Sequence, residues 1–505
     1  MKTGTRVKWK NYVGNQLADP LQLLAPGTLT ELIEIILEAK KKTLKIKAVG
    51  AGHSTSDIML SDDFMVDIRN LNNILPSSQF DLKPGFKDDT NLIFVEAGIH
   101  LFQLNKILDD MGKALINMGA YTGQTLAGVI STSTHGSGIS LGAFPSYVRA
   151  IIMADENGEL IQIERAGENS ISKGPATIVG GLQVRLVQDD NHFKAIVVSM
   201  GCMGLIYAVG LEVTNHYKLK ETRQFSTWSK VKHQIDFENL LQDNRHVEVL
   251  VSPYKFTANE HKCLVTCRND PGENEKKSLI PRGHRKWFFE VLLFVIPSTV
   301  IDFVMRLIIN HFPKMIPGLV QGMFASLTDR NYVDKSFKVL DLGRANNLSA
   351  YAMELTFPSD QFTKAVDAIL ELSNNSVQEG KQYLTGPVSL RFIKTNSFFL
   401  SMQYSESENQ YVCMIEFPTV RKAFGGYELL SRIESAMRIF NSRPHWGQVN
   451  HVGGEGKEAL YKLYPKFDEW LKVYRHYSKA GRFQNNFTRR CGIEVEVNPM
   501  QIPFT

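Results

Sequence analysis

Cysteine is scarce in this chain: it has five cysteines in 505 residues. The number is odd and the spacings do not match those of zinc sites, so neither a structural zinc site nor a disulfide framework is expected. The nearest pair, Cys263 and Cys267, falls in an alternating, strand-like segment that would turn both side chains to one face. A disulfide between them stays open, but two half-buried thiols in a reducing compartment are the favoured interpretation.

Long blocks of like charge are also missing. The chain has 57 Lys and Arg against 52 Asp and Glu, so the net charge is 57 − 52 = +5, and these charges are dispersed. The only short basic run, residues 40–42, ends an expected helix, where cations interact favourably with the helix dipole. Because no basic stripe interleaved with aromatic residues is present, nucleic-acid binding is not expected.

No apolar run is long enough to cross a bilayer, which takes about 20 predominantly apolar residues. Residues 287–312 come nearest, but their longest uncharged run before Asp302 is residues 291–301, and Pro297 interrupts it. This pattern predicts two apolar helices kinked near Pro297. They are buried under another domain, rest on a membrane surface, or form a subunit interface. The first residues have no apolar core of a cleavable signal peptide, so a cytoplasmic or peripherally membrane-associated protein is expected.

Two glycine-rich loops stand out among the segments that are present. The first is residues 49–57, Val49-Gly50-Ala51-Gly52-His53-Ser54-Thr55-Ser56-Asp57, which follows an alternating strand at residues 44–49. Its glycines permit positive φ and its hydroxyls add donors, so it is either a polar turn or a phosphate-binding loop at a strand end. The second is residues 119–138, with five glycines and mostly Ala, Ser or Thr at the other positions. Such small residues suit close packing of backbone against a large flat ligand, although neither loop is a Rossmann or Walker A motif.

Four segments together resemble the aldonolactone oxidases of the vanillyl-alcohol oxidase superfamily. They are the loop around His53, residues 125–136, residues 199–206 (Ser-Met-Gly-Cys-Met-Gly-Leu-Ile) and residues 443–448 (Arg-Pro-His-Trp-Gly-Gln). The matches run in the family's order from residue 9 to residue 485. The resemblance implies an α+β fold, with a two-subdomain FAD-binding domain over residues 1–215 and an antiparallel-sheet cap domain over residues 216–470. A tail at residues 471–505 is expected to return to the FAD-binding domain.

The periodicity of the chain predicts the main elements of these domains. Residues 29–44 are expected to form an amphipathic helix capped by Thr28 or Thr30. Further helices are expected at residues 365–372 and 428–440. Strands are expected at residues 64–68, 92–97, 148–154, 160–164, 388–392, 398–402 and 411–417, with a further apolar segment at 201–213.

The family places FAD on the glycine-rich segments, with a covalent bond between His53 and the 8α-methyl carbon of the flavin. A neutral imidazole nitrogen is a suitable nucleophile for that bond. His135 is implied to lie beside the cofactor without a bond. The residues expected to bind FAD are Val49, Gly50, Ala51, Gly52, His53, Ser54, Thr55, Ser56, Gly119, Thr122, Thr125, Gly128, Thr132, Thr134, His135, Gly204, Ile206, His445 and Asn485.

The catalytic positions depart from the family's pattern. The family uses a Glu-x-Arg pair and a Lys after His-Trp, whereas this chain has Ser389, Arg391 and Gln448 there. Loss of one member of a buried ion pair costs about 3–5 kcal/mol, so loss of both predicts a redesigned, neutral, hydrogen-bonding pair. Arg391 is expected to stabilise negative charge on flavin or substrate. Glu416 is the available replacement base, or an ordinary strand carboxylate.

These features predict a flavin enzyme that oxidises a CH–OH group of a sugar-lactone-like small molecule, with dioxygen or another carrier as the electron acceptor. Two alternatives remain open. Ser389, Gln448 and the apolar segment also suit a more apolar alcohol, such as a lipid or sterol. A non-catalytic, membrane-associated flavoprotein is the other, but a protein without cofactor has no use for intact flavin loops.

Overall fold

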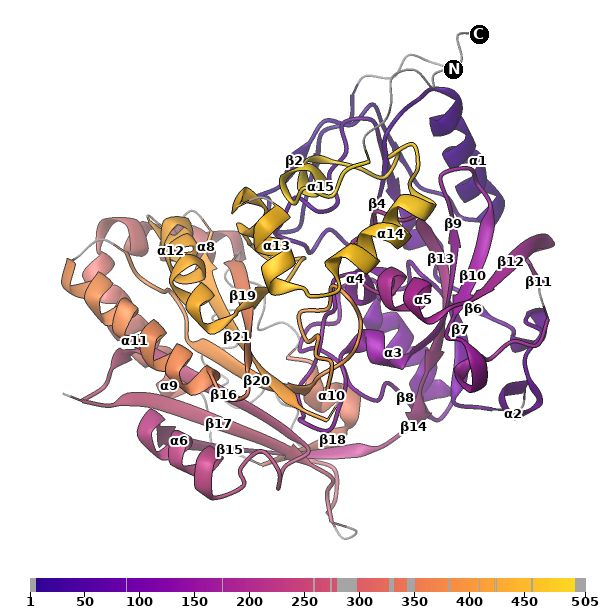
Figure 1. Cartoon of the computed structure of the whole chain (residues 1–505). Helices are drawn as coiled ribbons and strands as arrows, with labels where there is room; N and C mark the ends of the chain where they lie inside the picture. Colours follow the sequence, from indigo (N-terminus) through magenta and orange to yellow (C-terminus); the bar gives the residue numbers. More distant parts are fainter. Residues whose placement is uncertain are drawn as a thin grey trace.

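The structure is a computed structural model that describes residues 6–87, 89–174, 176–257, 259–272, 275–278, 298–326, 331–342, 350–379, 382–407, 409–421, 423, 425–455 and 457–495. It has the expected α+β architecture, with two sheet-based lobes (Figure 1). The first lobe, in indigo and magenta, holds a three-stranded and a seven-stranded sheet. The second, in pink and orange, is built on one eight-stranded sheet, and the C-terminal helices in yellow lie over the first lobe.

The three-stranded sheet carries the first glycine-rich loop. It is parallel, with the order β3-β5-β4. Its strands are β3 (Gln22–Leu24), β4 (Ile46–Val49) and β5 (Phe64–Asp67). Helix α1 (Leu29–Lys41) connects β3 to β4, and the Thr28 side chain accepts a hydrogen bond from Glu31 N, as the capping pattern predicts. The helix ends three residues before the predicted Leu44, because Thr43 adopts a positive φ of 56°.

The seven-stranded sheet supports the second loop. Its order is β11-β12-β10-β9-β13-β7-β6. The strands are β6 (Ile74–Leu75), β7 (Leu92–Glu96), β9 (Val148–Ala154), β10 (Leu160–Glu164), β11 (Ala176–Val179), β12 (Leu182–Gln188) and β13 (Leu205–Glu212). The helices of this lobe are α2 (Pro84–Lys87), α3 (Leu101–Asp110), α4 (Leu126–Ser131) and α5 (Asp190–Ile196). Two short pairs complete it: β1 (Trp9–Lys10) with β2 (Leu17–Ala18), and β8 (Lys113–Ala114) with β14 (Thr214–Asn215).

The eight-stranded cap sheet is antiparallel throughout, with the order β18-β15-β17-β16-β20-β21-β19-β22. Its strands are β15 (Lys218–Thr227), β16 (His246–Lys255), β17 (His261–Asn269), β18 (Tyr332–Lys335), β19 (Ala350–Pro358), β20 (Val388–Lys394), β21 (Tyr411–Val420) and β22 (Arg443–Pro444). The helices are α6 (Trp228–Phe237), α8 (Ser298–His311), α9 (Ile316–Ser326), α10 (Ser336–Leu340), α11 (Phe362–Glu379) and α12 (Gly426–Met437), followed by α13 (Lys457–Leu463), α14 (Phe467–Tyr477) and α15 (Asn486–Arg490).

Alternation along the cap strands separates a core face from a polar face. One face packs its apolar side chains against α6, α11 and α12 in a single buried cluster that includes Val249, Leu355, Leu390 and Ile415. Because successive side chains point to opposite faces, the residues between them face the other way. These include Glu248, Glu354, Ser389, Arg391 and Glu416. The apolar pattern that builds the cap core therefore also turns these polar side chains toward the first lobe.

Residues 398–402 do not form the predicted strand, although their residue types favour one. All five are buried, and the backbone turns, with Ser401 N donating to Phe398 O at 3.0 Å and Leu400 O accepting from Trp446 Nε1 at 2.7 Å. A short apolar run fits a buried turn as well as a buried strand.

All five cysteines are free thiols, and Cys263 is buried while Cys267 is half-buried.

The apolar segment at residues 287–312 is described only in part. The kink predicted near Pro297 lies outside the described residues. From Ser298 to His311 the segment is helix α8, on which Phe303 is 60% exposed and Ile309 is buried. Within the described residues, no helix has both the length and the apolar character needed to cross a membrane.

Candidate active site

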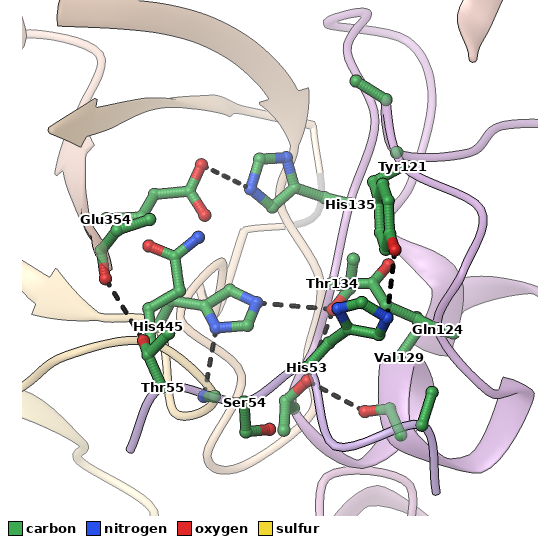
Figure 2. Close-up of a pocket in the computed structure, with 18 of the residues that line it drawn as sticks. His53, Ser54, Thr55, Tyr121, Gln124, Val129, Thr134, His135, Glu354 and His445 are labelled. Atoms are coloured by element: carbon green, nitrogen blue, oxygen red, sulfur yellow. Dashed lines mark hydrogen bonds and ion pairs between the residues drawn. The ribbon is translucent and has the colours of Figure 1, made fainter. Parts of the chain in front are cut away.

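A cavity of about 1200 Å³ lies between the two glycine-rich loops and the polar face of the cap sheet. Small-molecule sites commonly measure about 300–1000 Å³, so this cavity has room for a large cofactor together with a substrate. Figure 2 shows its centre, with His53 and Tyr121 contributed by the first lobe and Glu354 and His445 by the cap and the segment after β22.

The two loops touch each other where they line the cavity. A Cβ atom added at Gly50 would lie 2.1 Å from Thr125 Oγ1, so any larger side chain would push the loops apart. Gly52 has a φ of +67°, which only glycine adopts without strain. Lys47 on β4 also lines the cavity and is fully buried, with its Nζ 2.9 Å from Gly201 O and 3.3 Å from Met200 O. A buried ammonium favours an anion nearby, so this wall suits a phosphate-bearing cofactor.

Three histidines share the cavity, and their hydrogen bonds distinguish them. His135 Nδ1 lies 2.9 Å from Gly136 O and its Nε2 lies 3.1 Å from Glu354 Oε1. His445 Nδ1 accepts from Gly447 N at 3.1 Å, and its Nε2 lies 3.3 Å from Thr134 Oγ1 (Figure 2). Both nitrogens of these two rings are therefore engaged.

His53 is the exception among the three. Its Nε2 lies 3.0 Å from Tyr121 Oη, and within the described part of the chain its Nδ1 has no hydrogen-bond partner. Burial, with a smaller contribution from His100, lowers the pKa of His53 to about 4. The ring is therefore neutral at physiological pH, and one nitrogen lone pair is available as a nucleophile.

Glu248 is the centre of a charged network on the cap sheet. Its Oε1 accepts from Arg391 Nε at 3.2 Å and from Arg391 Nη2 at 3.0 Å, and its Oε2 accepts from Arg268 Nη2 at 3.0 Å. Burial alone would raise the pKa of Glu248, but the two guanidinium groups outweigh it and hold that pKa below its ordinary value. Glu248 therefore supplies the carboxylate for Arg391 from the neighbouring strand, where the family pattern has it on the same strand.

Glu354 and Glu416 form the other carboxylate pair of the cavity, directly opposite each other on β19 and β21. Burial raises the pKa of Glu354, but His135, His445 and Arg391 together lower it below the ordinary value. The pKa of Glu416 is raised by burial and by the Glu354 charge, with Arg391 opposing. Within the described residues, the side-chain hydrogen-bond partner of Glu416 is Gln448, whose Nε2 donates to Glu416 Oε1 at 3.3 Å.

Ser389 and Gln448 do not form the neutral pair that the sequence suggests. Ser389 Oγ donates to Glu248 Oε1 at 3.4 Å, whereas Gln448 donates to Glu416. Position 448 therefore has a carboxylate partner other than residue 389. A lysine there would meet the Glu416 carboxylate.

We expect Gln448→Lys to be tolerated and Ser389→Glu to be destabilising. A glutamate at position 389 would lie beside Glu248 and opposite Glu416, so it would add a buried like charge costing about 3 kcal/mol or more. Denaturant unfolding of the two single variants checks this expectation. Equal destabilisation by both substitutions would contradict it, because it would mean that Glu416 does not stabilise the new ammonium.

The cavity gathers most of the residues that the sequence singles out. All four catalytic candidates line it, and so do all but three of the cofactor candidates: Ser56, Thr122 and Asn485 do not. These three tie the loops in place. Ser56 Oγ donates to Trp446 O at 2.7 Å, Thr122 Oγ1 donates to Asp341 Oδ2 at 2.8 Å, and Asn485 Nδ2 donates to Leu60 O at 2.9 Å.

Several residues that line the cavity were not predicted from the sequence. They are Tyr12, Lys47, Tyr121, Arg223, Glu248, Lys338, Asp341 and Glu354. Glu248 and Glu354 had a usable signal, because each is a carboxylate between apolar residues of a strand (Val247 and Val249, Met353 and Leu355). No sequence pattern identified Tyr12 and Tyr121, because an aromatic residue in a loop can have many different roles.

Comparison with protein families finds two matches. The family described as D-arabinono-1,4-lactone oxidase matches residues 209–491, and the family described as FAD binding domain matches residues 20–164. Among curated proteins, the chain is 24% identical over 494 residues to L-gulono-1,4-lactone dehydrogenase of Mycobacterium tuberculosis, covering 95% of this chain and 98% of the relative. It is 23% identical over 484 residues to L-gulonolactone oxidase of Mus musculus, covering 96% and 98%.

A third relative and the solved structures extend this picture. D-arabinono-1,4-lactone oxidase of Candida albicans is 22% identical over 419 residues, covering 80% of this chain and 68% of the relative. The structure titled solvent-stable cholesterol oxidase superposes with a TM-score of 0.77 at 14% sequence identity, covering 96% of this chain and 97% of the other. At that identity the superposition shows a shared fold and nothing about the substrate.

Proposed function

The chain belongs to the D-arabinono-1,4-lactone oxidase family and is an FAD-dependent oxidoreductase acting on CH–OH groups, and we propose that its substrate is a sugar lactone. The observation that carries the proposal is the single cavity in which the glycine-rich loops face the carboxylates and Arg391 of the cap. Hydroxyl groups of a sugar lactone would find both donors and acceptors on that wall, whereas an apolar alcohol would offer no partner to Arg391 Nη1, which has none within the described residues.

The residues present fit FAD. The cavity is large, its loops leave no room for a Cβ atom at Gly50, and Lys47 presents a buried positive charge. We propose that the residues of both loops, with Gly204 and Ile206, hold the cofactor, and that it is attached covalently to His53. The available nitrogen of His53 supports this assignment, because both nitrogens of His135 and of His445 already have partners.

Bound FAD supplies a hydride acceptor, and the cap residues prepare the substrate for hydride loss. We propose that Glu416 accepts the proton of the oxidised hydroxyl, since its carboxylate lines the cavity and its raised pKa makes it a stronger base than an ordinary glutamate. Arg391, held by Glu248, is proposed to stabilise the negative charge that develops during the reaction.

The role of Glu416 predicts the pH dependence of flavin reduction. The base must be ionised, so the rate should rise with pH through the raised pKa of Glu416, above the range of an ordinary carboxyl group. Glu416→Gln should remove this limb and slow reduction by about 10²-fold. Rapid-mixing measurements of flavin absorbance from pH 4 to pH 9 are the check. A limb that persists in Glu416→Gln would assign the base to another residue.

Anaerobic bleaching of the flavin tests the function as a whole. The purified protein is mixed with a panel of aldonolactones, their open-chain aldonates, polyols and sterols, and the absorbance of oxidised flavin is followed. Lactones are expected to bleach it fastest. Faster bleaching by a sterol or a polyol would overturn the substrate assignment. Because the relatives are named both oxidase and dehydrogenase, reoxidation of the bleached protein by dioxygen then identifies the acceptor.

A further inference from the structure

Two tyrosine rings contact the His53 ring. The ring centroid of Tyr12 is 4.4 Å from that of His53, and the Tyr121 ring meets it edge-on at 4.6 Å. The Tyr121 hydroxyl is also hydrogen-bonded to His53 Nε2 at 3.0 Å (Figure 2). Burial, together with the hydroxyl of Tyr12, raises the pKa of Tyr121 to about 12, so its phenol stays protonated at physiological pH. A neutral phenol can donate one hydrogen bond and accept others.

The chain holds Tyr121 in this position from both sides. Its neighbour Thr122 donates to Asp341 Oδ2 at 2.8 Å, and Leu342 N donates to Ala120 O at 2.9 Å, so the cap clamps the loop. A Cβ atom at residue 123 would lie 2.4 Å from the Tyr121 hydroxyl, and glycine there leaves room for it. The contact with His53 is thus fixed by the loop and does not depend on a mobile side chain.

We propose that Tyr121 is the positioning residue for attachment of FAD to His53: its hydroxyl accepts a hydrogen bond from Nε2–H and leaves Nδ1 as the attacking nitrogen. This inference rests on the proposed covalent bond. Attachment of FAD would then be the function of the Tyr121 hydroxyl, which neither the fold nor the binding of a lactone requires. The Tyr12 ring, tilted by 42° with its centroid 4.4 Å away, also packs against the imidazole and restricts its rotation.

The attachment step balances as an oxidation of the protein and the methyl group by the flavin. One C–H bond of the 8α-methyl group and the N–H bond of neutral His53 break, and one bond forms between Nδ1 and the 8α-carbon. The two electrons and two protons released reduce the flavin, and dioxygen then reoxidises it with formation of hydrogen peroxide. The protonated Tyr121 phenol accepts the hydrogen bond from Nε2–H and so stabilises the positive charge that develops on the ring, and the Nε2 proton is then released to solvent, from which the reduced flavin takes up its proton.

Attachment can be timed on apoprotein made in a riboflavin-deficient host and then mixed with FAD in air. Covalent flavin is measured as the fluorescence that remains with acid-precipitated protein, and reversible binding as quenching of free FAD. Tyr121→Phe keeps the ring and loses the hydroxyl, so it should bind FAD with unchanged affinity but attach it about 10²-fold more slowly. Tyr461→Phe removes a hydroxyl that donates to Asp468 on the surface and should attach FAD at the wild-type rate.

The nitrogen that becomes attached separates the positioning role from a packing role. In the wild type the flavopeptide should carry the flavin on Nδ1 of His53 alone, whereas in Tyr121→Phe the slowly attached flavin should be divided between Nδ1 and Nε2. Attachment by Tyr121→Phe at the wild-type rate, or slow attachment to Nδ1 alone, would overturn the inference alone. Release of FAD from the wild-type protein by acid would instead overturn the covalent bond itself.

Discussion

Replacement of Arg391 by alanine is expected to slow reduction of the flavin by substrate about 10³-fold. Loss of one preorganised donor that stabilises developing charge costs about 10²–10³ in rate. Arg391 offers a full charge as well: Nε and Nη2 are bound to Glu248, while Nη1 has no hydrogen-bond partner within the described residues and the side chain lines the cavity. The measurement is the single-turnover rate of flavin bleaching at saturating lactone.

Arg268 is the matched control for this experiment. It binds the same Glu248 at 3.0 Å and Glu221 at 2.9 Å, but it does not line the cavity. Either alanine variant removes one partner of a buried ion pair, at about 3–5 kcal/mol, so both should lose stability. Only Arg391→Ala should also lose the reduction rate in the protein that remains folded. Equal rate losses in both variants would assign the effect to the network and remove Arg391 from the reaction.

The two loops that line the cavity from the first lobe were predictable from the sequence because each is a local feature. Glycine-rich loops are contiguous segments, and their composition alone departs from that of helices and core strands. Residues 49–55 line the cavity without a break, and eight of the eleven residues from Thr125 to His135 line it as well. Strand β4, which ends in the first loop, and strand β9, which follows the second, were predictable for the same reason, since alternation and β-branched residues are recognised over a short window.

The arrangement of the cap residues that line the cavity depends on strand pairing, which a single sequence does not give. Glu248 lies 143 positions before Arg391 in the chain, yet β16 and β20 place the two residues opposite each other. The sequence shows that position 389 is not a glutamate, but it does not show that β16 supplies one. Without the strand pairing, Ser389 and Gln448 were predicted to be partners, whereas each of them is hydrogen-bonded to a different carboxylate.

Replacement of His53 by alanine is expected to abolish covalent flavin completely. No other cavity histidine has a nitrogen available, since His135 is bound to Gly136 and Glu354, and His445 to Gly447 and Thr134. The wild-type protein should stay yellow after acid precipitation, and its tryptic flavopeptide should contain His53. The variant should release any FAD it binds, while its far-UV circular dichroism stays unchanged, because His53 belongs to no buried apolar cluster.

His135→Ala is the matched variant, because it removes an imidazole from the same cavity. It should weaken FAD binding through loss of the hydrogen bond to Glu354, but the FAD that it retains should still be covalent. The two variants therefore differ in the kind of flavin that they keep and not only in its amount. Covalent flavin in His53→Ala, or only dissociable flavin in the wild type, would contradict the assignment of the bond to His53. It would also show that one available nitrogen in a cavity is not enough to identify a nucleophile.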